Sequence, residues 1–210
     1  MLPNPGPGRF IVFEALDGAG KTTQVHLLSC HLGQSRPVYV TYEPSDGPAG
    51  LQIRMVLEHR IHVDPAALAA LFAADRMDHL YHHDGEGGIV ARLQRGVDTI
   101  SDRYYLSSFA YQGMSLDWDW IAQMHVHCIR PDLTFFVDVP VAVCLERIAR
   151  RRGRRFDLFE NQDALTLVRQ AYLAAIDRLA QMGESVEIVD GNAPPDQVHA
   201  AIWQRVAQLR

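Results

Sequence analysis

A glycine-rich segment carries the clearest chemistry in this sequence. Residues 15–23 read ALDGAGKTT, and Gly18, Gly20, Lys21 and Thr22 match the end of the pattern GxxxxGK(S/T). Glycines let successive backbone N–H groups point at phosphate oxygens, and a following helix adds unpaired donors and a positive dipole. The lysine would bridge the outer phosphates, and the threonine would help to hold Mg²⁺. The segment predicts a nucleotide-binding P-loop, with a turn that binds nothing as the alternative.

One position of this loop departs from the pattern. Ala15 stands where the motif has its first glycine. A methyl group costs about 1 kcal/mol where the backbone needs positive φ. We therefore expect the loop to form only if Ala15 has ordinary β geometry. A P-loop also leaves the reaction open, because switches, motors and kinases all use one.

The segments around the loop predict an α/β fold. Short apolar runs typical of buried strands occur at residues 10–16, 38–42, 97–101, 133–139 and 186–190. Helical patterns occur at residues 22–32, 50–60, 65–82, 106–110, 118–129, 141–151, 164–181 and 195–209. This alternation predicts a five-stranded parallel sheet with helices on both faces. Ligands of such folds bind at the carboxyl ends of the strands.

Composition limits the possible classes of protein. The 210 residues, 48% of them hydrophobic, suit one compact domain, expected over residues 9–210. Residues 1–8, rich in proline and glycine, read as a flexible leader. The formal charge of −5 argues against a nucleic-acid binder. No apolar stretch approaches the roughly 20 residues of a membrane helix, and residues 1–10 do not contain the apolar run that is typical of a secretory signal. We expect a soluble cytoplasmic protein without a membrane partner.

Further motifs narrow the choice among P-loop proteins. They are FEALDGAGKTTQ (13–24), EP (43–44), LFAADR (71–76), SDRYYLSSFAYQG (101–113) and RPDLTFFVDV (130–139). Together, in this order, the motifs resemble those of thymidylate kinases. The resemblance implies a P-loop nucleoside monophosphate kinase fold with a short lid. It also implies transfer of the γ-phosphate of ATP to dTMP, giving dTDP and ADP, with Mg²⁺ as cofactor and a homodimer as the assembly.

The resemblance also implies roles for individual residues. The ATP site would comprise Ala15, Leu16, Asp17, Gly18, Ala19, Gly20, Lys21, Thr22 and Thr23. The dTMP site would comprise Asp17, Glu43, Arg54, Phe72, Arg76, Arg103, Ser107, Ser108, Tyr111 and Gln112. Thr22 and Asp102 would hold the metal, and Lys21, Asp17 and Arg103 would act in catalysis.

Two parts of this assignment have independent physical support. Phe72 and Arg76 lie four residues apart on one helix face, where a ring and a guanidinium suit a flat base. Taken alone, the pair would more often be a core aromatic and a solvated arginine. Arg103 follows a predicted strand, so its guanidinium would lie at the sheet's carboxyl edge, where it can bind phosphate oxygens. The second loop departs from the family, since Ser45 and Asp46 replace a double glycine.

An arginine cluster follows the sixth helical pattern. Six arginines lie between residues 147 and 155, around Gly153, and predict a mobile basic lid over residues 150–160. An arginine supplied to the moving phosphoryl group contributes roughly 10³ to 10⁵ in rate. The sequence resembles bacterial enzymes that carry this arginine in the lid, with Arg151, Arg152 and Arg155 as candidates. A solvated charge run or an RNA-binding patch is the alternative.

Two other functions stay open at this stage. A related P-loop kinase could use a different nucleotide or a deoxynucleoside as acceptor. A non-catalytic regulator could bind ATP without transferring its phosphate.

Overall fold

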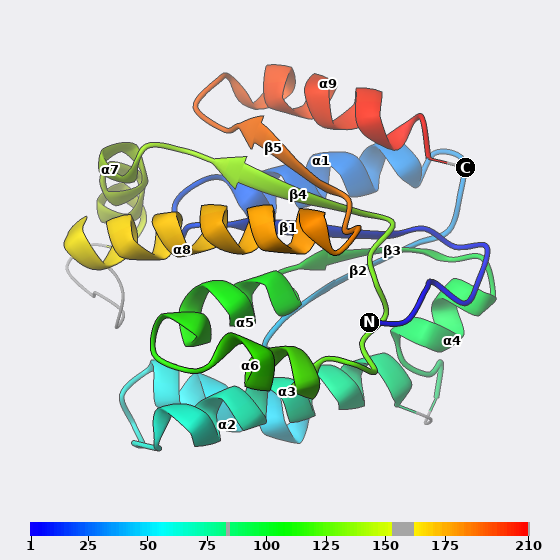
Figure 1. The fold of residues 1–210 in the computed structure, drawn as a ribbon. Coiled ribbons are helices and arrows are strands. Elements are labelled where there is room, and N and C mark those ends of the chain that lie inside the picture. The colour runs from blue at the N-terminus through cyan, green and yellow to red at the C-terminus, as the bar shows by residue number, and fades with distance from the viewer. Residues whose placement is uncertain (83–84, 153–161, 210) are drawn as a thin grey trace.

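The computed structural model describes residues 1–82, 85–152 and 162–209. Its centre is a five-stranded sheet in the order β2-β3-β1-β4-β5, with every neighbouring pair parallel (Figure 1). The strands are β1 (Phe10–Ala15), β2 (Val38–Tyr42), β3 (Asp98–Asp102), β4 (Leu133–Asp138) and β5 (Val186–Asp190). All residues of β1 are buried, as the run FIVFEA suggests for a central strand. The predicted α/β class and parallel sheet are confirmed.

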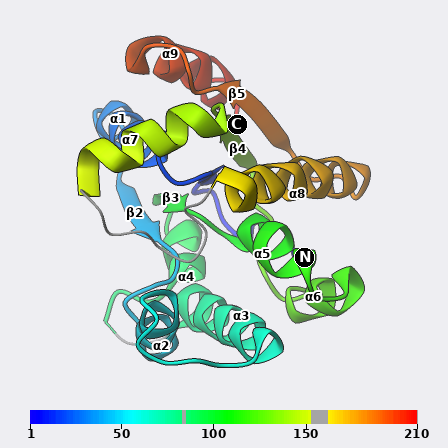
Figure 2. The same cartoon turned by 90° about the vertical axis from the view of Figure 1, so that its left-hand side faces the viewer.

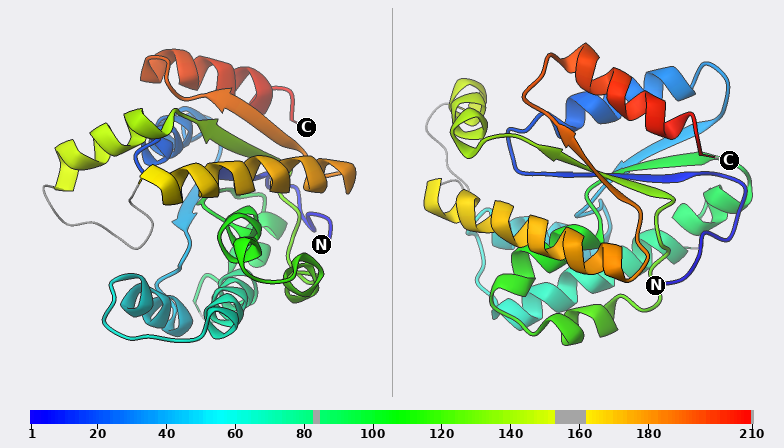
Figure 3. Two further views of the ribbon diagram at one scale, coloured as in Figure 1. Left: turned by 60° about the vertical axis from the view of Figure 1, so that its left-hand side comes forward. Right: turned by 45° about the horizontal axis from the view of Figure 1, so that its top comes forward.

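Helices cover both faces of this sheet. They are α1 (Lys21–Leu32), α2 (Pro48–Leu57), α3 (Pro65–Tyr81), α4 (Ile89–Gln94), α5 (Tyr105–Tyr111), α6 (Trp118–Met124), α7 (Val141–Arg152), α8 (Gln162–Gln181) and α9 (Pro195–Val206). Figure 2 shows α1 and α9 on one face and α5 and α8 on the other. In both views of Figure 3, α7 lies beyond the carboxyl end of β4, from which it follows.

Some element bounds differ from the sequence prediction. Helix α4 and a short 3₁₀ helix, Gln112–Met114, were not predicted, and the three residues of the 3₁₀ helix are too few for a periodic pattern. Helix α6 ends at Met124, whereas the pattern predicts a helix to residue 129. A turn follows, in which the Cys128 N–H donates to the His125 carbonyl at 2.9 Å. The turn brings Ile129 beside Leu2.

Residues 1–8, the expected leader, form hydrogen bonds with the rest of the domain. The Leu2 N–H donates to the Cys128 carbonyl, and the Leu2 carbonyl accepts from the Arg130 N–H, both at 2.7 Å. Asn4 Nδ2 donates to Asp132 Oδ2 at 2.7 Å. Because backbone and amide groups form these contacts, a low apolar content does not prevent them. Within the described ranges, no helix is both long and apolar enough to cross a membrane.

Candidate active site

The P-loop joins β1 to α1 at the carboxyl edge of the sheet. Ala15 is the last residue of β1, so its backbone has strand geometry, which any side chain can adopt. The positive φ values belong to Gly18, at 81°, and Gly20, at 95°. A side chain at residue 18 would bring Cβ within 2.5 Å of the Cys144 carbonyl oxygen. The two glycines that the loop requires are therefore present, and the first motif position tolerates alanine.

Three predicted residues meet where α1 begins and β3 ends. Thr22 Oγ1 donates to Asp102 Oδ2 at 3.2 Å, and Lys21 Nζ forms an ion pair with Asp102 Oδ1. Lys21 is buried, and burial, followed by repulsion from Arg103, lowers the pKa of its ammonium group to about 7. Negatively charged phosphates would favour the charged form of such a lysine.

Arg103 is the centre of a second cluster. Its backbone has φ of 76°, rare for a residue other than glycine, and its N–H donates to the Phe13 carbonyl at 2.8 Å. Nη2 donates to Asp17 Oδ1 at 2.6 Å. Nη1 donates to Ser107 Oγ at 3.2 Å and to the Tyr172 hydroxyl at 2.9 Å. A strained backbone held by many contacts is typical of functional sites.

Glu14 and Tyr172 support this cluster and were missed by the sequence analysis. Glu14 is fully buried, and its carboxylate accepts from the Tyr104 N–H at 2.8 Å and from Ser107 Oγ at 2.6 Å. The Tyr172 hydroxyl donates to Glu14 Oε2 at 3.0 Å. Burial raises the pKa of Glu14, and the nearby charge of Arg103 opposes this shift. A carboxylate inside the apolar run FIVFEA was the signal that could have identified Glu14.

A pocket of about 560 Å³ opens beside Arg103. The residues predicted for the acceptor that line it are Asp17, Phe72, Arg103, Ser107, Tyr111 and Gln112. Residues not predicted complete the wall, namely Pro44, Val56, Leu57, His62, Val63, Pro65, Leu68, Met114 and Ser115. The pocket combines a largely apolar wall with charged groups from Asp17 and Arg103. Such a lining suits a flat organic group with a phosphate.

Four residues predicted for the acceptor do not line this pocket. Arg54 Nη1 donates to the carbonyls of Pro44, at 3.0 Å, and Ser45, at 2.7 Å, so it organises the loop after β2. Glu43, Arg76 and Ser108 form a buried group behind the wall. Arg76 Nε donates to Glu43 Oε2 at 2.8 Å, and Arg76 Nη1 donates to Ser108 Oγ at 3.1 Å.

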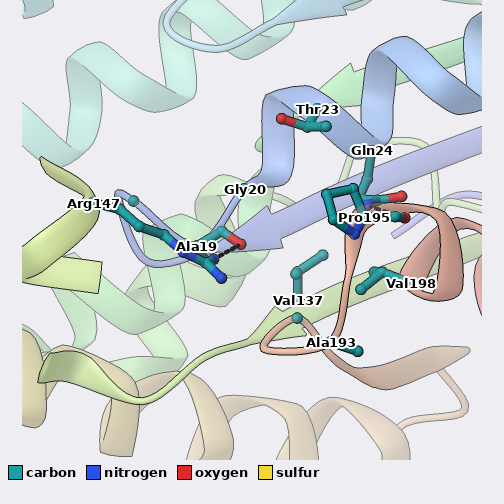
Figure 4. Close-up of a pocket in the computed structure, with 11 residues that line it drawn as sticks. Ala19, Gly20, Thr23, Gln24, Val137, Arg147, Ala193, Pro195 and Val198 are labelled. Carbon is teal, nitrogen blue, oxygen red and sulfur yellow. Dashed lines mark hydrogen bonds between the residues drawn. The ribbon is translucent and has the colours of Figure 1, made fainter. Parts of the chain in front are cut away.

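A second pocket, of about 210 Å³, lies beside the P-loop (Figure 4). Its lining comprises Gly18, Ala19, Gly20, Thr23, Gln24, Val137, Arg147, Gly191, Ala193, Pro195 and Val198. Arg147 Nη1 donates to the Ala19 carbonyl at 3.2 Å, and Gln24 Nε2 donates to the Pro195 carbonyl at 3.0 Å. The part of this lining that follows β5 was not predicted from the sequence. Two pockets that meet at one phosphate loop suit the transfer of a phosphoryl group between two ligands.

The predicted arginine lid is only partly described. Arg151 and Arg152 belong to the last turn of α7, but their side chains lie outside the description. Arg155 and the rest of the lid from residue 153 lie outside the described residues. Helix α7 does deliver Arg147 to the P-loop, as Figure 4 shows. Arg147 belongs to the arginine cluster but was not among the predicted catalytic residues.

Comparisons with known proteins agree on one family. The family model described as thymidylate kinase matches residues 13–202. The thymidylate kinase of Thermosynechococcus vestitus is 38% identical, covering 97% of this chain and 89% of that protein. Thymidylate kinases of Rhodopseudomonas palustris, strain TIE-1, and Nitrosomonas eutropha are 38% and 36% identical. The alignments cover 95% and 96% of this chain, and 88% and 94% of those two proteins.

Proposed function

This chain belongs to the thymidylate kinase family and phosphorylates dTMP with ATP, and we propose that the two pockets beside the P-loop hold these two substrates. The observation that carries the proposal is the position of the loop. Asp17 lines the larger pocket, and the next residue, Gly18, lines the smaller one. The loop therefore stands between the two ligands, where the phosphoryl group must pass.

The smaller pocket is the proposed site for the nucleoside of ATP. Val137, Ala193 and Pro195 give it apolar walls, and Arg147 adds a planar cation. From there, the phosphates would follow the loop toward the N-terminus of α1, where Gly20 provides no side-chain cap. Lys21 would bind the outer phosphates.

The larger pocket is the proposed site for dTMP. Arg103 would bind the acceptor phosphate, and Phe72 would stack on the thymine. Tyr111 and Gln112 would face the sugar and the base, and Asp17 would approach the sugar hydroxyl. Arg76 and Ser108, just behind the wall, would bind the base edge, while Glu43 and Arg54 would shape the loop.

Thr22 and Asp102 are the proposed Mg²⁺ ligands. Both offer oxygen atoms, 3.2 Å apart, and oxygen is the donor that Mg²⁺ prefers. The site residues thus fit the metal. When bound, Mg²⁺ would neutralise charge on the phosphates of ATP.

Catalysis by this site reduces to positioning and charge stabilisation. A monophosphate oxygen is already anionic, so no general base is required. Lys21, Arg103 and one of the lid arginines, Arg151, Arg152 or Arg155, would stabilise the transferring group. We also propose a homodimer, in which the half-exposed Trp120 of α6 contributes to the contact between subunits.

Coupled ADP release tests this function directly. Wild type, with ATP and Mg²⁺, is compared on dTMP, dUMP, dCMP, dGMP, AMP and thymidine. Turnover should be fastest with dTMP and be lost in Lys21→Ala, but kept in Arg178→Ala, which removes an exposed arginine paired with Asp119. Faster turnover of another acceptor would contradict the assignment of the larger pocket. ATP binding without acceptor-dependent ADP release would contradict kinase activity.

A further inference from the structure

A buried polar group lies directly behind the larger pocket. Arg76 lies one helical turn after Phe72 on α3, and Ser108 of α5 lies one turn before Gln112, the residue that caps this helix. Phe72 and Gln112 line the pocket, whereas only 1% of Arg76 and 4% of Ser108 are exposed. The orientation of the Arg76 guanidinium is therefore set by its neighbours in the protein.

His125 is one of these neighbours. It caps the carboxyl end of α6, is fully buried, and packs against the rings of Tyr105 and Phe109. Its Nε2 lies 3.0 Å from Arg76 Nη1. Glu43 Oε2 binds the opposite part of the guanidinium, through Nε at 2.8 Å and Nη2 at 2.6 Å.

The chemistry of this contact fixes the tautomer of His125. A guanidinium has five N–H donors and no acceptor, so Nε2 must accept. The ring proton is therefore on Nδ1, which has no hydrogen-bond partner among the described residues. Burial, followed by the charge of Arg76, lowers the pKa of His125 to about 3, in agreement with a neutral ring.

The contact with His125 also determines which N–H groups of Arg76 remain available to a ligand. Glu43, Ser108 and His125 take one N–H at Nε, one at Nη2 and both at Nη1. Of the five donors, the contacts described here leave one N–H on Nη2. Without His125, Ser108 would be the remaining partner of Nη1 among the contacts described above. The guanidinium could then change its orientation while it keeps the ion pair with Glu43.

We propose that His125 is a positioning residue, whose neutral ring accepts from Arg76 Nη1 and directs the remaining Nη2 donor toward the thymine base. This role rests on the proposed binding of dTMP in the larger pocket. His125 itself does not line that pocket, so its effect must pass through Arg76.

A set of substitutions separates this role from simple packing. In His125→Gln, the amide oxygen reaches the former position of Nε2 and accepts from Arg76. In His125→Asn, the shorter side chain reaches only the position of Nδ1, and in His125→Phe a ring of similar shape has no acceptor. His127→Phe is the control, because His127 is an exposed residue on the same turn.

Steady-state kinetics should then divide the variants. The KM for dTMP should rise about tenfold in His125→Phe and His125→Asn, the factor expected for a lost hydrogen bond to a charged group. It should stay within about twofold of wild type in His125→Gln and His127→Phe. The kcat and the KM for ATP should change little, because Lys21 and the smaller pocket are untouched. Equal dTMP KM values in wild type and His125→Phe, or no difference between the Gln and Asn variants, would overturn the positioning role.

A spectroscopic readout makes the result independent of turnover. In ¹⁵N NMR spectra of the histidine rings, assigned through the His125 variants, Nε2 of His125 should be unprotonated and Nδ1 protonated at neutral pH. A proton on Nε2 would overturn the proposal even in an active enzyme. Failure of wild type to bind or phosphorylate dTMP would instead refute the proposed function, and with it the role of His125 toward that base.

Discussion

Removal of the Tyr172 hydroxyl should weaken catalysis more than its effect on folding explains. This hydroxyl contacts three groups, namely Arg103 Nη1 at 2.9 Å, Ser107 Oγ at 2.8 Å and Glu14 Oε2 at 3.0 Å. In Tyr172→Phe the ring would keep its contact with Phe136, at 4.9 Å between centroids. The substitution therefore removes hydrogen bonds and leaves no cavity.

The expected magnitude follows from these partners. A hydrogen bond to a charged group contributes about 1.5 to 3 kcal/mol. The losses are not additive, because Glu14 keeps the Tyr104 N–H and Arg103 keeps Asp17. We expect a loss of about 2 kcal/mol in unfolding free energy, or a fall in Tm of about 4 to 8 °C. Because Arg103 is less well held, kcat/KM for dTMP should fall at least about tenfold.

Tyr105→Phe provides a matched control. The Tyr105 hydroxyl is also buried and donates to a carboxylate, Glu184 Oε2, at 2.7 Å, but lines neither substrate pocket. Both variants should lose similar stability in urea unfolding, and only Tyr172→Phe should lose kcat/KM in the coupled ADP assay. Equal kcat/KM values for the two variants would refute the argument that Tyr172 positions Arg103.

Other perturbations test separate parts of the structure. Lys21→Ala should lower kcat at least about 10²-fold in the coupled assay. Its unfolding free energy in urea should fall by no more than about 1 kcal/mol, because the ammonium is buried at a cost and the partner left behind, Asp102, is partly exposed and keeps its hydrogen bond from Thr22. Asp98→Ala should cost about 3 to 5 kcal/mol in urea unfolding without changing either KM, since buried Asp98 pairs with Arg9 at 2.5 Å and Arg36 at 3.2 Å. Burial lowers the pKa of His125 from 6.5 to about 3, so the unfolded chain binds a proton that the folded chain does not between these pH values. The stability that the folded protein has above pH 6.5, where His125 is neutral in both states, is therefore lost progressively as the pH falls below 6.5. From pH 6.5 to 5, wild type should lose up to about 2 kcal/mol more than His125→Gln in urea unfolding, and equal losses would contradict the assignment.

The part of the site that sequence predicts well is encoded locally. The apolar runs at residues 38–42 and 186–190 match β2 and β5 in both bounds. Short apolar runs that are bounded by turn residues are typical of buried strands. The P-loop lies within one such junction, so its glycines, Lys21 and Thr22 were identifiable from spacing alone. The role of Asp102 came instead from the family resemblance, and the structure places this residue at the end of β3, the strand next to β1.

The part that sequence does not predict depends on contacts between distant segments. Glu14 and Tyr172 are 158 residues apart, and no local pattern shows that they meet. The residues after β5 that line the smaller pocket are likewise brought into place only when α9 packs on α1. Leader residues 1–8 attach through backbone groups, which composition does not reveal. The resemblance placed Arg76 in the acceptor site, but only the structure shows that Glu43, Ser108 and His125 hold it behind the wall.

The two outer nitrogens of Arg103 have different surroundings, and this difference explains how the residue can be both rigid and available. Nη1 is held by Ser107 and Tyr172, which also bind the fully buried Glu14. Nη2 pairs with Asp17, whose side chain is half-exposed at the pocket. A doubly charged phosphate in the pocket would compete with Asp17 for Nη2, while Nη1 keeps its partners. The guanidinium would then exchange one anion for another without turning, so little reorganisation would accompany binding. Loss of the Ser107 and Tyr172 contacts at Nη1 should therefore slow phosphate transfer clearly. Loss of Asp17 should have only a small effect on folding.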